Sequence, residues 1–149
     1  MSSNADAGLT AYIAELHRAV HAIGLFLDER LEGRVSQPEA LLLLHLSTLG
    51  DLSVNALHQA FLHRRSTLTS VLDRLESKGL VQRTASAMDR RSVEVSLTAQ
   101  GARLAAKIAH AIDALAGELA PSLAVGARDV ARLRRLAETA AKLAAADDR

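Results

Sequence analysis

The order of patterns in the middle of the sequence constrains the fold of this chain most strongly. Residues 65–78 have the periodicity of an amphipathic helix, and Gly79 directly after them is typical of a helix C-terminus. The apolar side of this helix consists of Leu68, Val71, Leu72 and Leu75. Residues 80–84 and 92–98 read as two short strands, because apolar and polar residues alternate in the second. The sequence therefore predicts a helix followed directly by a β-hairpin with a loop over residues 85–91.

Three more helices are expected before this segment. The first is long and amphipathic, ends near Gly33 and has a coiled-coil-like seam made of Leu9, Ile13, Leu16, Val20, Ile23, Leu27 and Leu31. Ser36 and Glu39 form a capping box before a largely apolar helix over residues 39–47. Ser53 can cap a short helix over residues 54–61. Two close helices followed by a hairpin are the elements of a winged helix-turn-helix.

The C-terminal third is predicted to be helical. Thr98 can cap a second long helix that Pro121 stops, and an alanine-rich helix follows. We expect a mainly α fold with a small β-hairpin wing: a winged helix-turn-helix over residues 36–100, flanked by dimerisation helices over 1–35 and 101–149. The apolar seams at both ends predict a homodimer, because a lone monomer would have difficulty covering both.

Composition excludes several classes of protein. The chain has no cysteine, which rules out disulfides and thiolate metal sites. Two Phe, one Tyr and no Trp leave little for the stacking that single-stranded nucleic acids and RNA require. Residues 1–10 lack an apolar signal core, and no apolar run approaches the ~18 residues of a membrane helix. We therefore expect a soluble, cytoplasmic protein without a membrane partner.

Charge is unevenly distributed although the net charge is only +1. Residues 1–62 contain three Lys or Arg against seven Asp or Glu, whereas residues 63–110 contain nine against four. Residues 111–149 balance at six each. A basic central segment in a nearly neutral chain indicates a local interaction with a polyanion.

The polar side of the helix over residues 65–78 suits a DNA major groove. Its candidate base-reading residues are Ser66, Thr67, Thr69 and Ser70. Short hydroxyl side chains bring the helix close to base edges, and a threonine methyl can touch a thymine methyl. Arg64, Arg65 and Arg74 can reach phosphates or a guanine edge. By itself, the same pattern also describes an ordinary surface helix.

The hairpin loop ends in Asp89-Arg90-Arg91. An arginine at the tip of such a loop can enter the minor groove, where the negative potential favours it. A nearby carboxylate can hold the guanidinium in one orientation and so reduce the ordering cost of binding. We interpret Asp89 as the orienting group and Arg91 as the minor-groove contact, with Arg90 or Arg83 on phosphate. The alternative is a solvated turn with a surface ion pair.

Residues 36–105 resemble the multiple antibiotic resistance regulator (MarR) family in the order and spacing of their motifs. The motifs are Ser66-Thr67-Leu68-Thr69, Leu72-Asp73-Arg74-Leu75-Glu76-Ser77-Lys78-Gly79-Leu80-Val81, Asp89-Arg90-Arg91 and Leu97-Thr98-Ala99-Gln100-Gly101. The resemblance implies a bacterial homodimeric winged-helix transcription factor on double-stranded DNA, most simply a repressor, whose terminal helices dimerise. It also implies a small organic effector between the dimerisation and DNA-binding parts. One departure is Ser70, where family members often carry arginine.

The candidate effector contacts lie outside the basic central segment. With so few aromatic residues, the pocket is expected to be lined by Leu, Ile, Val and Ala, with Tyr12, His17 and His45 as polar candidates. A metal-responsive regulator is an alternative, because His17 and His21 share a helix face. The histidines that could complete such a site are His45, His58, His63 and His110. The simpler interpretation is surface, core or phosphate-contacting histidines, so we expect no metal and no cofactor.

Two other classes of function remain. The sequence has no Gly-rich phosphate loop, no Cys nucleophile and no His-Glu-x-x-His, and it shows no recognisable Ser/His/Asp set, so we do not expect an enzyme. A winged-helix protein-interaction module that does not use DNA is the second alternative. Salt-dependent binding to duplex DNA separates that module from a transcription regulator.

Overall fold

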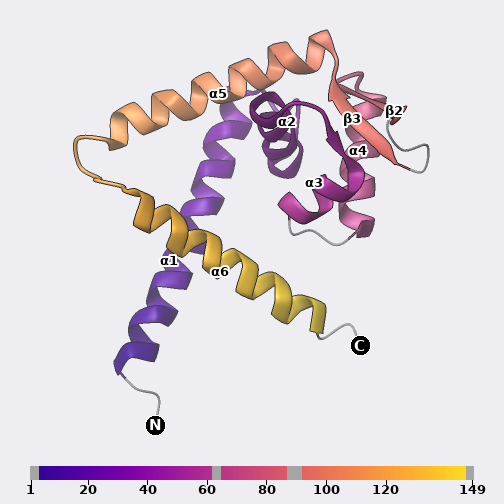
Figure 1. The fold of residues 1–149 in the computed structure, drawn as a ribbon. Coiled ribbons are helices and arrows are strands. Elements are labelled where there is room, and N and C mark those ends of the chain that lie inside the picture. The colour runs from indigo at the N-terminus through magenta and orange to yellow at the C-terminus, as the bar shows by residue number, and fades with distance from the viewer. Residues whose placement is uncertain (1–3, 62–64, 87–91, 147–149) are drawn as a thin grey trace. The chain divides into compact units, whose positions relative to one another are not determined.

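The computed structural model describes residues 4–61, 65–86 and 92–146. Its elements, in chain order (Figure 1), are α1 (Asn4–Arg30), α2 (Gln37–Leu49), β1 (Leu52–Ser53), α3 (Val54–Phe61), α4 (Arg65–Ser77), β2 (Val81–Ala85), β3 (Val93–Leu97), α5 (Ala99–Leu119) and α6 (Ala127–Ala146). The predicted class, mainly α with a small β-hairpin wing, is confirmed. None of the described helices is long and apolar enough to cross a membrane.

The chain divides into two compact units, Met1–Gln37 and Pro38–Arg149. The first unit consists of α1 and the turn that follows it. This turn contains two residues in the left-handed region, Glu32 with φ 55° and Gly33 with φ 65°. The amide of Gly33 donates to the carbonyl of Asp28 at 3.0 Å. The helix therefore ends at Arg30, slightly before the glycine that was expected to stop it.

The apolar core of the second unit is built by leucines from successive helices. Four leucines are completely buried: Leu42 and Leu43 of α2, Leu57 of α3 and Leu75 of α4. Val95 of β3 and Ile108 of α5 are buried as well. Complete burial of such a side chain stabilises the fold by about 1.5–3 kcal/mol relative to exposure. This burial fixes which face of α4 remains outside.

The described strands form one antiparallel sheet in the order β1-β3-β2. Val81 pairs with Leu97 and Ala85 with Val93, so β2 and β3 are the predicted hairpin. The sequence analysis did not predict β1, in which Leu52 pairs with Val95. Two residues are too few to show the alternation that identifies a strand. The predicted cap is present, because Oγ of Ser53 accepts from the amide of Ala56 at 3.0 Å.

The hairpin is joined to α4 and α5 by a compact junction. The hydroxyl of Thr98 donates to the carbonyl of Gly79 at 2.6 Å and accepts from the amide of Gly101 at 3.0 Å. Gly79 has φ +67°, as expected for the residue after a helix. A Cβ added to Gly101 would lie 1.8 Å from the carbonyl oxygen of Leu80, so only glycine permits this close approach. The junction therefore fixes where the strands leave α4.

Candidate nucleic-acid interface

Helix α4 presents a polar face made of short side chains. Leu68, Val71, Leu72 and Leu75 are buried on its inner face. The four predicted base-reading residues, Ser66, Thr67, Thr69 and Ser70, are all exposed. The structure therefore brings them together on the outer surface of one helix, as predicted. Contact between these residues and DNA stays a prediction.

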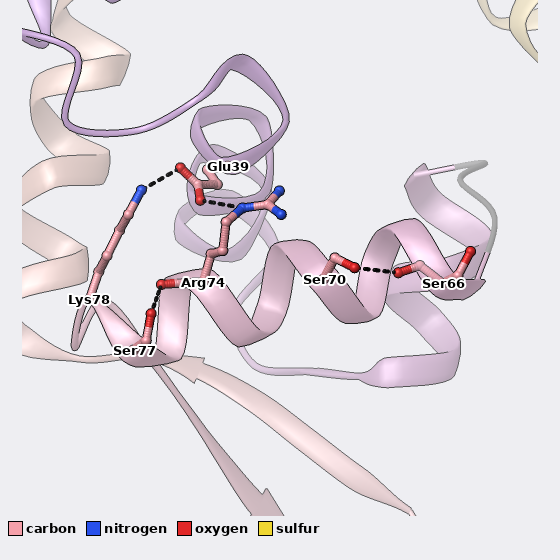
Figure 2. Close-up of polar contacts among 6 residues, drawn as sticks. All are labelled: Glu39, Ser66, Ser70, Arg74, Ser77 and Lys78. Atoms are coloured by element: carbon pink, nitrogen blue, oxygen red, sulfur yellow. Dashed lines mark hydrogen bonds and ion pairs between the residues drawn. The ribbon is translucent and has the colours of Figure 1, made fainter.

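One of these hydroxyls is already engaged by the helix itself. Oγ of Ser70 donates to the backbone carbonyl of Ser66 at 3.0 Å (Figure 2). Ser70 then offers only acceptor lone pairs to a partner, because its one proton is used. At a base edge, it would suit a donor such as the amino group of cytosine or adenine.

Arg74 is held from the inside of the fold. Its Nε donates to Oε1 of Glu39 at 3.1 Å, while about half of its side chain remains exposed. Figure 2 shows the two terminal nitrogens of the guanidinium directed away from Glu39. The other carboxylate oxygen accepts from Nζ of Lys78 at 2.8 Å. Glu39 was interpreted only as part of a local capping box, so sequence reasoning missed these two long-range ion pairs.

Arg83 connects the wing to α4. Its Nη2 lies 2.5 Å from Oδ1 of Asp73, and its Nη1 lies 3.7 Å from Oε2 of Glu76. The buried Nε of Arg83 has no hydrogen-bond partner in the described part of the chain. Arg83 was predicted as a possible phosphate contact, and that remains untested. In this arrangement it neutralises Asp73 on the outer side of α4 and braces β2 against the helix.

Ser86 forms hydrogen bonds across the base of the wing. The amide of Ser86 donates to the carbonyl of Ser92 at 2.9 Å, and its hydroxyl donates to Oε1 of Glu94 at 2.8 Å. The predicted wing residues Asp89, Arg90 and Arg91 lie outside the described residues, as does Arg64. Arg65 begins α4, but its side chain is outside the described part.

The candidate effector residues lie on two units of the chain. Tyr12 and His17 are exposed on α1, within Met1–Gln37. His45 lies on α2 within Pro38–Arg149, half-buried, with its ring centroid 4.6 Å from that of Phe61. Its Nδ1 lies 3.0 Å from the carbonyl oxygen of Leu41, and a carbonyl only accepts, so Nδ1 carries the proton. This leaves Nε2 as the remaining polar atom of the ring.

A histidine metal site finds no support in the described residues. His17 and His21 are both exposed on α1. Within residues 4–61, 65–86 and 92–146, no three His, Asp or Glu side chains are grouped so that they could hold a metal ion. His63 lies outside those ranges.

The outer face of α4, the adjoining hairpin and the short helices before them define the class of this protein, a winged helix-turn-helix. Residues 35–93 match the model of the MarR family. The winged-helix part of the chain is therefore similar to the MarR family, whose members are transcription regulators and not enzymes.

Solved structures agree with this assignment. A mutant of MarR from E. coli complexed with operator DNA is 27% identical, with a TM-score of 0.64 over 86% of this chain and 92% of that one. BldR from Sulfolobus solfataricus, a transcriptional regulator, has a TM-score of 0.74 at 21% identity over 93% and 99% of the two chains. An S. aureus MepR–DNA complex has a TM-score of 0.67 at 22% identity over 89% and 97%. The last two likenesses show the fold. No curated protein sequence matches this chain.

Proposed function

We propose that this protein is a sequence-specific regulator that binds double-stranded DNA as a homodimer on an inverted repeat. The proposal rests on the hydroxyl face of α4, which we define as its exposed residues Ser66, Thr67, Thr69 and Ser70. This face belongs to a helix that is followed directly by a hairpin, in the part of the chain that matches the MarR family. A major groove about 12 Å wide admits one α-helix, and short side chains let its backbone approach the bases. The likeness to an E. coli MarR structure that contains operator DNA supports this mode of binding.

The roles of the residues follow from their chemistry. Ser66, Thr67 and Thr69 read base edges, and Ser70 accepts from a base amino group. Arg64, Arg65 and Arg74 bind phosphates or a guanine edge, since guanidinium groups pair well with both. Arg91 enters the minor groove, oriented by Asp89, with Arg90 on phosphate. Arg83 either joins Arg90 on phosphate or stays with Asp73 and braces the wing; its contacts favour bracing.

Exposed apolar side chains support the homodimer. On α1 they are Leu9, Tyr12, Ile13, Val20 and Ile23. In the C-terminal part they are Leu119, Leu123, Val125, Val130, Leu133 and Leu143. Exposed apolar side chains repeated along a helix are typical of an interface. A twofold dimer requires an inverted-repeat site with half-site centres about one helical turn apart.

We further propose that the dimer represses transcription and that a small organic effector releases it from DNA. A bound dimer that covers a promoter blocks transcription by occupancy. An effector releases it only by binding the non-DNA-binding arrangement more tightly. Tyr12, His17 and Nε2 of His45 are the polar groups that we assign to effector recognition. Because the target is genomic duplex, we place the protein in the bacterial cytoplasm.

The test is selection of bound sites from random duplex, followed by affinity measurements over a range of salt concentrations. Counterion release predicts that the logarithm of the association constant falls linearly with the logarithm of salt, with a slope of about −0.9 per phosphate contact. The selected sites should contain an inverted repeat. A protein-interaction module would show neither the repeat nor the salt slope.

A further inference from the structure

Glu39 is a buried acidic residue in a helix that contains no Lys or Arg. It lies in the first turn of α2, and only 1% of its side chain is exposed, while nearly all other deeply buried side chains are apolar. A carboxylate removed from water is unfavourable unless it is paired and hydrogen-bonded. Such a residue therefore needs cations from elsewhere in the fold.

Both cations come from the C-terminal end of α4, because Arg74 lies in its last turn and Lys78 directly follows the helix. Oε1 accepts from Nε of Arg74 at 3.1 Å and Oε2 accepts from Nζ of Lys78 at 2.8 Å. Residues four apart lie on the same side of a helix, one turn from each other. One carboxylate thus connects the last turn of α4 and the residue after it to the start of α2 (Figure 2).

The geometry at Arg74 has a consequence for its outer atoms. A guanidinium is planar, so a hydrogen bond through Nε sets the direction in which Nη1 and Nη2 point. Both terminal nitrogens are directed away from Glu39, and 51% of the side chain is exposed. Arg74 is therefore held by its inner nitrogen while its outer nitrogens face solvent beside the hydroxyl face of α4.

We propose that Glu39 is a positioning residue for DNA recognition: its buried carboxylate, anchored by Lys78, fixes Arg74 so that the outer guanidinium nitrogens are ready for an operator phosphate. This inference rests on the proposed function and extends it to a residue that does not touch DNA. Fixing a long side chain before binding removes part of the ordering cost of the complex.

For Glu39→Met, the change in net charge and the loss of positioning predict opposite effects on DNA affinity. Glu39→Met keeps an unbranched side chain but removes both acceptor oxygens and one negative charge. By charge alone, loss of an anion near α4 strengthens binding to DNA. If Glu39 positions Arg74, affinity instead falls by about two- to tenfold, the cost of ordering one flexible side chain. Arg74 and Lys78 are both partly exposed, so their freed charges can reach water and the fold tolerates the change.

The matched control is Glu76→Met. Glu76 is on the same helix, two residues from Arg74, and it contacts Arg83 instead. This variant makes the same chemical change without affecting the Glu39–Arg74 hydrogen bond, and its affinity should stay equal or rise. Thermal unfolding of each variant, followed by circular dichroism, shows that it is folded at the assay temperature.

A second comparison separates positioning from general support of the fold. Arg74→Ala leaves Glu39 paired with Lys78, so this variant should fold. Adding Glu39→Met to Arg74→Ala should weaken DNA binding no further, because the group that Glu39 positions is already gone. A double variant that binds more weakly than Arg74→Ala would overturn the proposal.

A spectroscopic measurement tests the geometry without DNA. In nitrogen-15-labelled protein, the Nε–H signal of Arg74, identified by its loss in Arg74→Ala, should exchange slowly with solvent. It should exchange faster in Glu39→Met and stay slow in Glu76→Met. Equal exchange rates in all three proteins would show that Glu39 does not hold Arg74.

Wild-type protein that binds no duplex would overturn the proposed function. Wild-type binding with unchanged affinity in Glu39→Met would overturn only the positioning role of Glu39.

Discussion

The Nε atom of Arg74 lies 3.1 Å from Oε1 of Glu39, and 35 positions of sequence separate the two residues. The pair joins the start of α2 to the edge of the helix that we assign to the major groove. The side chain of Glu39 is buried and that of Arg74 is half-exposed. One end of the pair thus belongs to the core and the other to the proposed DNA interface.

The wing arginine carries the first prediction. Arg91→Ala should weaken binding to the selected operator by roughly 1–3 kcal/mol, because a minor-groove contact is lost. The dimer should stay intact, since the substitution is remote from α1 and α6 in sequence. Fluorescence anisotropy measures the affinity, and light scattering checks the dimer. Unchanged affinity would show that Arg91 of the wing does not contact the operator.

Thr69 is predicted to contribute to sequence preference more than to total affinity. Thr69→Ala removes the hydroxyl and the methyl that can touch a base edge, while the phosphate contacts remain. Site selection from a randomised duplex should then return a more degenerate consensus, with little change in non-specific binding. An identical consensus for both proteins would refute the role of Thr69 as a base contact.

Gly101 is predicted to be irreplaceable at the junction between the hairpin and α5. In Gly101→Ala the added Cβ would lie 1.8 Å from the carbonyl oxygen of Leu80, so backbone must move. Overpacking of this kind lowers the free energy of unfolding by about 1–3 kcal/mol or more. Urea unfolding monitored by circular dichroism measures the change.

The matched control for this prediction is on the same helix. A Cβ at Gly117 of α5 would meet nothing within 4 Å. Gly117→Ala should therefore stabilise the protein by about 0.5–1 kcal/mol through helix propensity. Equal effects of the two substitutions would show that the close approach at Leu80 is not present in solution.

The apolar seam of α1 is predicted to form part of the dimer interface. Light scattering should report about twice the monomer mass of 15.8 kDa. Ile13→Glu places a charge on the exposed apolar side of α1 and should shift the protein towards monomer. Ala11→Glu adds the same charge on the opposite side of the helical wheel and should leave the dimer intact. A wild-type monomer would contradict the seam argument.

Periodic patterns made most of the fold predictable. The helix Val54–Phe61 and the start of α4 at Arg65 agree with the sequence analysis, as do the caps at Ser53 and Thr98. These features depend on neighbours within a few residues, which a sequence displays directly. The strand β1 has only two residues, Leu52 and Ser53, which is too short for a periodic pattern. Its pairing with β3 is non-local, so neighbouring residues do not indicate it either.

The candidate site was predictable only in part. The exposed hydroxyl face of α4 follows from its helical period. The ion pair of Arg83 with Asp73 joins residues 10 positions apart, and the pairs of Glu39 with Arg74 and Lys78 join residues 35 and 39 positions apart. The sequence does contain an acidic residue at the start of an apolar helix and two cations four residues apart. Their pairing could not be read without the fold.

The most direct test of the account is a crystal structure of the dimer bound to a duplex obtained by site selection. We predict that α4 lies in the major groove with Thr69 at a base edge, Arg74 on a phosphate and Arg91 in the adjacent minor groove. An α4 or an Arg91 that faces bulk solvent in that complex would show that the protein does not bind DNA through both grooves.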